Sequence, residues 1–219
     1  YSTGRGYNSI PLALPNGTTI VAGSCAGSGG PGWNACTWHL DAQGHPVSGF
    51  GDNGLLTHGE LAGGTNNDEW NAAVVVPNNR VLLCGASDSV SDSQDEVIAR
   101  IHAADGAFDT TFGGGDGYWT DDVMGLGRLG RVNDCIVQVD GGIVAGLEVH
   151  NGTDWDVAVI RLHPDGTRDL EFGDVGVVVL GGVGTEERHP RMVEQADGRV
   201  LLTTSQSGTD SDIIVWRIR

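Results

Sequence analysis

The sequence has no lysine, few aromatic residues and no long apolar run. Its 12 basic residues are all arginine and face 29 acidic residues, which gives a formal net charge of -17 at pH 7. Such a surface repels nucleic acid and anionic lipid, so neutral sugars, cations and basic proteins are the suitable partners. A salty habitat or a demand for solubility would produce the same acidity. Without a run of 18 apolar residues, we expect no membrane-spanning helix and no membrane insertion.

Charged residues make up only 19% of the chain, whereas glycine is abundant, with 36 residues. This composition favours short strands joined by tight turns over amphipathic helices.

The four cysteines form an even set, which fits an oxidising compartment. Of the three pairings we favour Cys25 with Cys36 and Cys84 with Cys135; four buried free thiols are the alternative. The sequence begins at Tyr1 without a methionine, as after removal of a signal peptide, although a trimmed chain would look the same. We therefore expect a protein that is secreted or held at the cell surface, in the extracellular space or periplasm.

An internal repeat organises the chain. Two apolar runs flank a polar two-residue turn four times, and the turns are Asn16-Gly17, Asn78-Asn79, Asp140-Gly141 and Asp197-Gly198. Residues that tolerate positive φ at such places are the strongest local signal of a β-hairpin. The first turn residues are 62, 62 and 57 positions apart, so the repeat is about 60 residues long.

Each of the first three hairpins is followed by a third strand, a glycine turn and then Phe-Gly, with the phenylalanines at Phe50, Phe112 and Phe172. The fourth hairpin is followed by a third strand alone. We expect these rings to pack between neighbouring repeats. Short apolar segments after them predict outer strands at 55–57, 118–120 and 177–180. Four strands per repeat without a 3.6-residue period predict an all-β protein, a β-propeller of four four-stranded blades packed around a shared axis.

We expect a single β-propeller domain over residues 1–219. The repeats fall at approximately 8–69, 70–131, 132–188 and 189–219. Because the last repeat stops at its third strand, the fourth blade needs an outer strand from the N-terminal stretch 1–6 or from a partner chain. An unpaired edge gives a route to a homo-oligomer.

The hairpin, an R-[IL]-x-x-D-G sequence and an F-G-x-x-G sequence together resemble the bacterial delta-60 repeat family. The resemblance covers nearly the whole chain, and it implies secreted or surface-attached propellers without shared catalytic residues. The sequence departs from the family where Trp38-His39-Leu40 lacks the usual arginine and where Asn78-Asn79 replaces Asp-Gly.

Two motifs that could bind a cofactor or a metal ion do not indicate such a site here. The glycines at 125, 127 and 130 match the dinucleotide-binding pattern, but a strand rather than a helix is expected after them. His39, His102 and His163 recur in three repeats at registers that differ, so they are not expected to form a zinc or copper ring. We predict no catalytic residues, no metal site and no cofactor.

Calcium is the alternative, because carboxylates gather before each third strand. Since one position is shared by every copy, at Asn34, Asp95, Asp156 and Asp212, we interpret these side chains as caps of the loop backbone.

Three tryptophans are expected in loops and not in apolar strands: Trp33, Trp70 and Trp155. An exposed indole beside Asn or Asp is a common way to hold a sugar ring, and the predicted ligand-binding residues are Trp33, Trp70, Asn71, Asp154 and Trp155. The alternative is that each indole covers a junction between blades.

These features favour an exported binding module that recognises a glycan or a protein partner through propeller loops. A structural protein that oligomerises through an open blade edge is the second hypothesis. The third is a polysaccharide-acting hydrolase or lyase with two carboxylates as acid and base, so the sequence leaves enzymatic activity open and favours its absence.

Overall fold

The computed structural model describes residues 6–26, 32–64, 67–90, 93–123, 125, 129–182, 184–207 and 211–218. These residues form four antiparallel sheets, three of four strands and one of three, which follow one another along the chain as the blades of a propeller. No helix among them is long and apolar enough to cross a membrane.

The strands follow one another in space as they do in sequence. Blade 1 contains β1 (Gly6–Ala13), β2 (Thr19–Ala26), β3 (Trp33–Leu40) and β4 (Leu55–His58). Blade 2 contains β5 (Glu69–Val76), β6 (Arg80–Asp88), β7 (Gln94–His102) and β8 (Tyr118–Asp121), with the short 3-10 helix η1 (Gly113–Gly115) before its last strand. Blade 3 contains β9 (Gly130–Val137), β10 (Ile143–His150), β11 (Trp155–Leu162) and β12 (Val177–Leu180). Blade 4 contains β13 (Glu186–Glu194), β14 (Val200–Ser207) and β15 (Ser211–Ile218).

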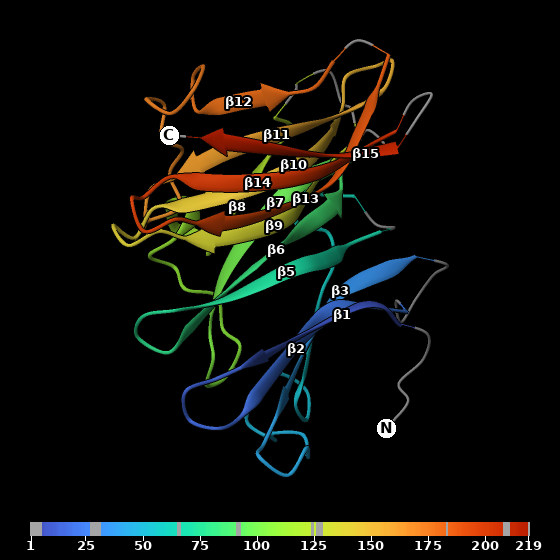
Figure 1. The fold of residues 1–219 in the computed structure, drawn as a ribbon. Helices are drawn as coiled ribbons and strands as arrows, with labels where there is room; N and C mark the ends of the chain where they lie inside the picture. The colour runs from blue at the N-terminus through green and yellow to red at the C-terminus, as the bar shows by residue number, and fades with distance from the viewer. Residues whose placement is uncertain are drawn as a thin grey trace.

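The predicted hairpins are confirmed, since β1–β2, β5–β6, β9–β10 and β13–β14 all pair antiparallel. Positive φ occurs at Gly17, Gly141 and Gly198, and at both Asn78 and Asn79. Asparagine tolerates this conformation better than most residues, which is why Asn-Asn replaces a glycine turn in blade 2 without changing the fold. The four hairpin turns lie together along the left of Figure 1, which we call the hairpin end; the other is the loop end.

The blades pack face to face, and each junction has its own apolar core. Between blades 2 and 3, Leu82 and Ile98 of one sheet meet Ala145 and Ile160 of the next. The phenylalanines lie in these junctions as predicted: Phe50 and Phe112 are fully buried, and Phe172 is half-buried against blade 4. Because successive side chains of a strand point to opposite faces of its sheet, blades 2 and 3 have apolar side chains on both faces.

The ring is open. Figure 1 shows blade 1 at the bottom and blade 4 in the upper half, where it overlaps blade 3. The face of blade 4 that points away from blade 3 exposes Val193, Val215 (60%) and Ile213 (79%). The equivalent of Val215 in blade 2 is Ile98, which blade 3 buries completely. The four blades are therefore arranged as an arc around the shared axis.

The predicted all-β fold of four blades is confirmed, and the last blade has three strands among the described residues, as expected for a repeat that stops at its third strand. From Gly6 onward, the N-terminal stretch pairs with β2 inside blade 1, and residues 1–5 lie outside the described residues. The outer edge of β15 therefore receives no strand from the described N-terminal residues.

Both favoured disulfides are present. Cys25–Cys36 joins β2 to β3 within blade 1, with Cα atoms 5.8 Å apart. Cys84–Cys135 joins β6 of blade 2 to β9 of blade 3 across 51 residues, with Cα atoms 6.7 Å apart. The second bond forms only where two blades lie face to face, so it links the repeats covalently. Two disulfides fit an oxidising compartment.

Candidate functional site

The five predicted binding residues all belong to the loop end, where β3, β5 and β11 begin. They form two groups. Trp33 and Trp70 come from the junction of blades 1 and 2, whereas Asn71 of β5 contacts blade 3, to which Asp154 and Trp155 belong.

The innermost strand of each blade carries an irregularity at this end. In β5 the pairing with β6 shifts between Trp70 and Ala72, which leaves Asn71 as the extra residue of a β-bulge. Equivalent shifts lie at Asn8 in β1, at Asn133 in β9 and at 189–190 in β13. Bulges re-aim side chains and are frequent beside functional sites.

Asn71 uses the bulge to bridge two blades. Its Nδ2 donates to Glu69 Oε1 at 3.1 Å and to the carbonyl oxygen of Val132 in blade 3 at 3.2 Å. The residue predicted as a ligand contact therefore also ties β5 to β9.

Trp155 makes cation–π contacts with two arginines. The guanidinium carbon of Arg188 is 4.2 Å from the centre of the indole and that of Arg131 is 5.3 Å from it, while the ring of His150 meets the indole edge-on. Cation–π contacts of this kind stabilise partly desolvated arginines. The indole is half-buried, and guanidinium groups already occupy positions over the ring that a sugar would need.

Glu148, which is buried on β10, holds the arginines in place. Its Oε2 is 3.4 Å from Arg188 Nη1 and 3.8 Å from Arg131 Nε, and its Oε1 accepts the backbone N–H of His189 at 2.7 Å. On the other side, Arg131 Nη1 is 3.7 Å from Glu69 Oε1. Each arginine side chain stays 29% exposed.

We call Glu69, Asn71, Arg131, Glu148, Trp155 and Arg188 the inner-strand site. Three of these residues, Glu69, Arg131 and Arg188, occupy equivalent positions in β5, β9 and β13. They pair with Ala86, Glu148 and Ser205, and each of these partners lies eight residues after the first turn residue of its hairpin. The site thus brings together Asn71 and Trp155, which are far apart in sequence, through Glu69 and Arg131.

The prediction of exposed loop indoles is wrong for Trp70. It lies in β5, is fully buried in the core between blades 1 and 2, and meets His58 edge-on. The β-bulge beside it turns this residue toward blade 1, which the linear pattern did not show. Trp33 begins β3 and is half-buried, and its carbonyl accepts the N–H of Asp68.

Asp154 is buried and does not reach the inner-strand site through its described contacts. Its carboxylate accepts from Asn151 Nδ2 and from the backbone N–H of Gly184, the latter at 2.9 Å. Asn151, rather than an aspartate, caps this loop, since its Oδ1 accepts the N–H groups of Thr153 and Asp154.

The shared position before the third strand is real, because Asn34, Asp95, Asp156 and Asp212 occupy one register in the four sheets. Over the described ranges, no group of three His, Cys, Asp or Glu side chains already has the geometry to hold a metal ion. His39 instead bonds Thr18 Oγ1 through Nε2 at 2.8 Å and packs edge-on against Phe50. Of the dinucleotide-like glycine segment, 126–128 lies outside the described residues.

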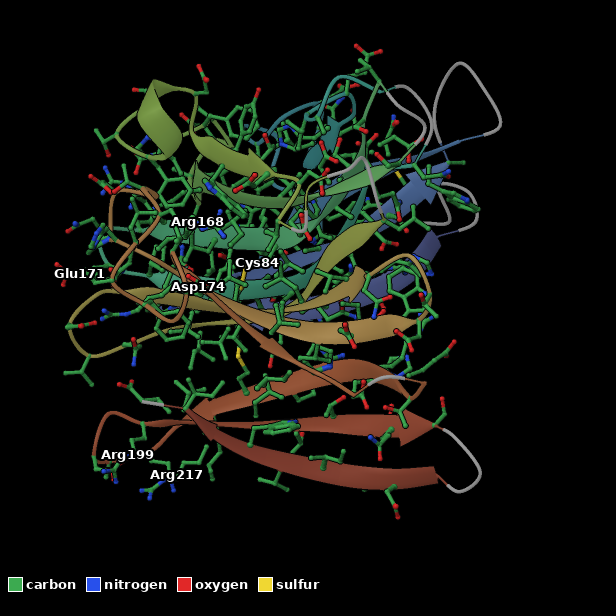
Figure 2. All side chains as sticks on the ribbon, turned by 90° about the horizontal axis from the view of Figure 1, so that it is seen from above. Cys84, Arg168, Glu171, Asp174, Arg199 and Arg217 are labelled. Carbon is green, nitrogen blue, oxygen red and sulfur yellow. A yellow bond between two sulfur atoms is a disulfide. The ribbon has the colours of Figure 1, made fainter. Side chains whose placement is uncertain are left out.

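Pockets occur at the opposite, hairpin end, in the grooves between blades. The one between blades 3 and 4 has a volume of about 450 Å³, and polar Gln138, Asp140, Arg161 and Glu194 surround apolar Val144 and Phe172. Figure 2 shows Arg199 and Arg217 close together at this end of blade 4, where both pair with Asp197.

The acids with the largest upward shifts do not line these pockets. Burial raises the pKa of Glu96 to about 8 and that of Asp68 to about 6, and both lie at the loop end of blade junctions. In the pocket between blades 3 and 4, the N–H of Gly142 and the pairing with Arg161 hold the pKa of Asp140 below its usual range.

Sequence reasoning missed Arg131, Glu148 and Arg188. The sequence did contain one signal for these residues: Arg131 and Arg188 occupy equivalent positions in their repeats, and Glu148 pairs with Arg131 across the hairpin. It becomes visible only when the repeats are aligned on strand register, because the inner-strand bulges offset the loop spacing.

Comparisons with known proteins agree on the fold. Residues 77–112 and 140–172 match the family described as a domain of unknown function (DUF5122) beta-propeller. No curated protein matches the sequence. The chain resembles the crystal structure of an endo-arabinase from Bacteroides thetaiotaomicron VPI-5482 with a TM-score of 0.54 and 11% identity, over 95% of this chain and 73% of the other. A hypothetical protein from Leishmania major aligns at a TM-score of 0.31 and 11% identity, over 96% of this chain and 83% of the other. The chain is therefore similar to DUF5122 beta-propellers in two of its repeats and shares its overall fold with the arabinase.

Proposed function

We propose that the protein is an exported binding module that recognises a glycan at the inner-strand site. The observation that carries the proposal is the stack of Arg131, Trp155 and Arg188 on buried Glu148 at the loop end of the innermost strands. Export to the extracellular space or periplasm agrees with the two disulfides and with the resemblance to secreted delta-60 repeat proteins.

The arginines define how such a ligand would be held. Their guanidinium groups are planar, carry several N–H donors in fixed directions and remain partly exposed, so they can donate to sugar hydroxyl or carboxylate oxygens. Glu69 and Asn71 add an acceptor and a donor nearby. Guanidinium edges, rather than the indole face, would therefore contact the ligand, and Trp155 would hold the arginines in position.

A glycan array with the wild type and matched variants tests the proposal. Arg188→Ala removes one donor group and should weaken binding at least tenfold, as expected for a charged hydrogen bond. Trp155→Ala should weaken it too by releasing both arginines. Arg199→Ala, at the hairpin end, should bind as the wild type does. No binding by the wild type would eliminate the glycan, and equal loss in Arg199→Ala would place the site elsewhere.

Assembly through an open edge of blade 4 is the second candidate. It is favoured by the three-stranded last sheet and by exposed Ile213 and Val215 on its outer strand. Mass measurement in solution tests it: Ile213→Lys should lower the mass of an assembly, and a strict monomer at high concentration would rule assembly out.

A further inference from the structure

Two carboxylates meet at the junction between blades 3 and 4, next in sequence to Trp155 and Arg188 of the inner-strand site. Asp156 lies near the start of β11, and Glu187, near the start of β13, is only 1% exposed. Between them passes Gly181, in the segment that leads from blade 3 to blade 4. We call Asp156 and Glu187 the junction pair.

Gly181 shows how close the junction pair comes. A Cβ on this glycine would lie 2.1 Å from Asp156 Oδ1 and 3.1 Å from Glu187 Oε2. Two oxygens this near a single point can both contact one ion at the calcium–oxygen distance of about 2.3–2.6 Å. The absence of a side chain at Gly181 is what leaves room between them.

One carboxylate oxygen of the junction pair, Glu187 Oε2, accepts no hydrogen bond from the described residues. Glu187 Oε1 accepts from Thr185 Oγ1 at 2.8 Å and from Gln206 Nε2 at 2.6 Å, but Glu187 Oε2 is buried without a partner. Asp156 Oδ2 accepts from Asn151 Nδ2 at 2.9 Å, so its Oδ1 is the oxygen that faces Gly181. A buried carboxylate oxygen without a donor is costly unless a proton or a cation compensates it.

No arginine supplies that compensation. The nearest basic residue in sequence, Arg188, pairs with Glu148 and Glu186. In the part of the chain that the structure describes, no arginine or histidine forms an ion pair with either member of the junction pair. Asp154, whose charge also acts on Asp156, adds further negative potential.

The equivalent position between blades 1 and 2 is also surrounded by polar side chains. Asn34 Oδ1 and Asp68 Oδ2 lie 3.2 and 3.5 Å from a Cβ on Gly59, the equivalent of Gly181. That junction offers one amide and one carboxylate where the junction pair offers two carboxylates. At these two positions, the formal charge is therefore more negative between blades 3 and 4 than between blades 1 and 2.

We propose that a calcium ion binds between blades 3 and 4, held by Asp156 Oδ1 and Glu187 Oε2. Two carboxylates leave several positions of calcium's six to eight to backbone carbonyls and water, as in the weaker sites of extracellular modules, where dissociation constants are about 0.1–1 mM. Because its ligands come from two blades, the ion would strengthen the junction.

Thermal unfolding with 0.01–10 mM CaCl2 against a chelator tests the proposal. At 10 mM, which is about ten- to a hundredfold above such dissociation constants, the melting temperature of the wild type should rise by roughly 3–10 °C. Asp156→Asn and Glu187→Gln should abolish the rise. The matched control is Asp212→Asn, at the equivalent position of blade 4 where the residue is exposed and no following blade packs, and it should keep the full rise.

Terbium gives a second readout that does not depend on the variants folding. Tb³⁺ at the site should luminesce when Trp155, the neighbour of Asp156, is excited, and calcium should quench the signal by competition. A melting temperature that calcium does not change would overturn the proposal. A fall of stability with rising pH that Glu187→Gln removes and Glu96→Gln does not would mean instead that the junction pair shares a proton. An equal calcium effect in Glu187→Gln would overturn the proposal as well.

Discussion

Replacing Phe112 by alanine should show how much the ring of one Phe-Gly segment contributes to the free energy of unfolding by packing between two blades. The ring is fully buried between blades 2 and 3, and the guanidinium of Arg100 lies 4.7 Å from its centre. The turn of the next blade closes over it, since Gly166 has room for no side chain beside the ring and Gly113 donates its N–H to Asp165 at 2.9 Å. Phe→Ala in such a core costs about 3–5 kcal/mol.

The repeat provides its own controls. Phe50 is equally buried, so Phe50→Ala should cost a similar amount. Phe172 occupies the same position in blade 3 but is half-buried, so Phe172→Ala should cost roughly half as much, about 2 kcal/mol. Equilibrium unfolding in guanidinium chloride, followed by tryptophan fluorescence and circular dichroism, measures all three. A Phe172→Ala variant as destabilised as Phe112→Ala would refute the idea that the following blade provides the burial.

Two further predictions concern the junctions. Burial raises the pKa of Glu96 from 4.5 to about 8, so folding takes up a proton in this window and stability should fall as pH rises from about 4.5 to 8, by at most about 1.4 kcal/mol per pH unit. Glu96→Gln should flatten that fall in a series of urea titrations, and an unchanged slope would contradict the assignment. Gly85→Ala should destabilise by at least about 2 kcal/mol, because its Cβ would lie 1.8 Å from the carbonyl oxygen of Glu69 at the bulge, whereas Gly49→Ala, in open space, should change stability by less than about 0.5 kcal/mol. Melting curves of both glycine variants check this, and equal effects would be inconsistent with the bulge.

Local chemistry was enough to predict the strands and turns. Asn-Gly and Asp-Gly dipeptides select hairpins whatever surrounds them, and the Phe-Gly repeat marks the junctions. The favoured pairing of Cys84 with Cys135 is confirmed as well, and it joins two neighbouring repeats.

What the sequence did not predict depends on contacts between blades. The burial of Trp70 follows from a β-bulge at Asn71, which changes the face to which the neighbouring side chain points. The stacking of Arg131 and Arg188 on Trp155 joins three strands from two blades, and no periodicity in one strand encodes it. The open ring likewise depends on the angle between sheets, which is set by packing across every junction.

Mapping the disulfides by mass spectrometry of the unreduced, proteolysed protein tests most directly whether successive repeats pack as adjacent blades. The structure predicts one crosslinked peptide pair containing Cys84 and Cys135, and a second containing Cys25 and Cys36. A bond from Cys84 to either cysteine of blade 1, or a free thiol at Cys135, would contradict the face-to-face packing of blades 2 and 3.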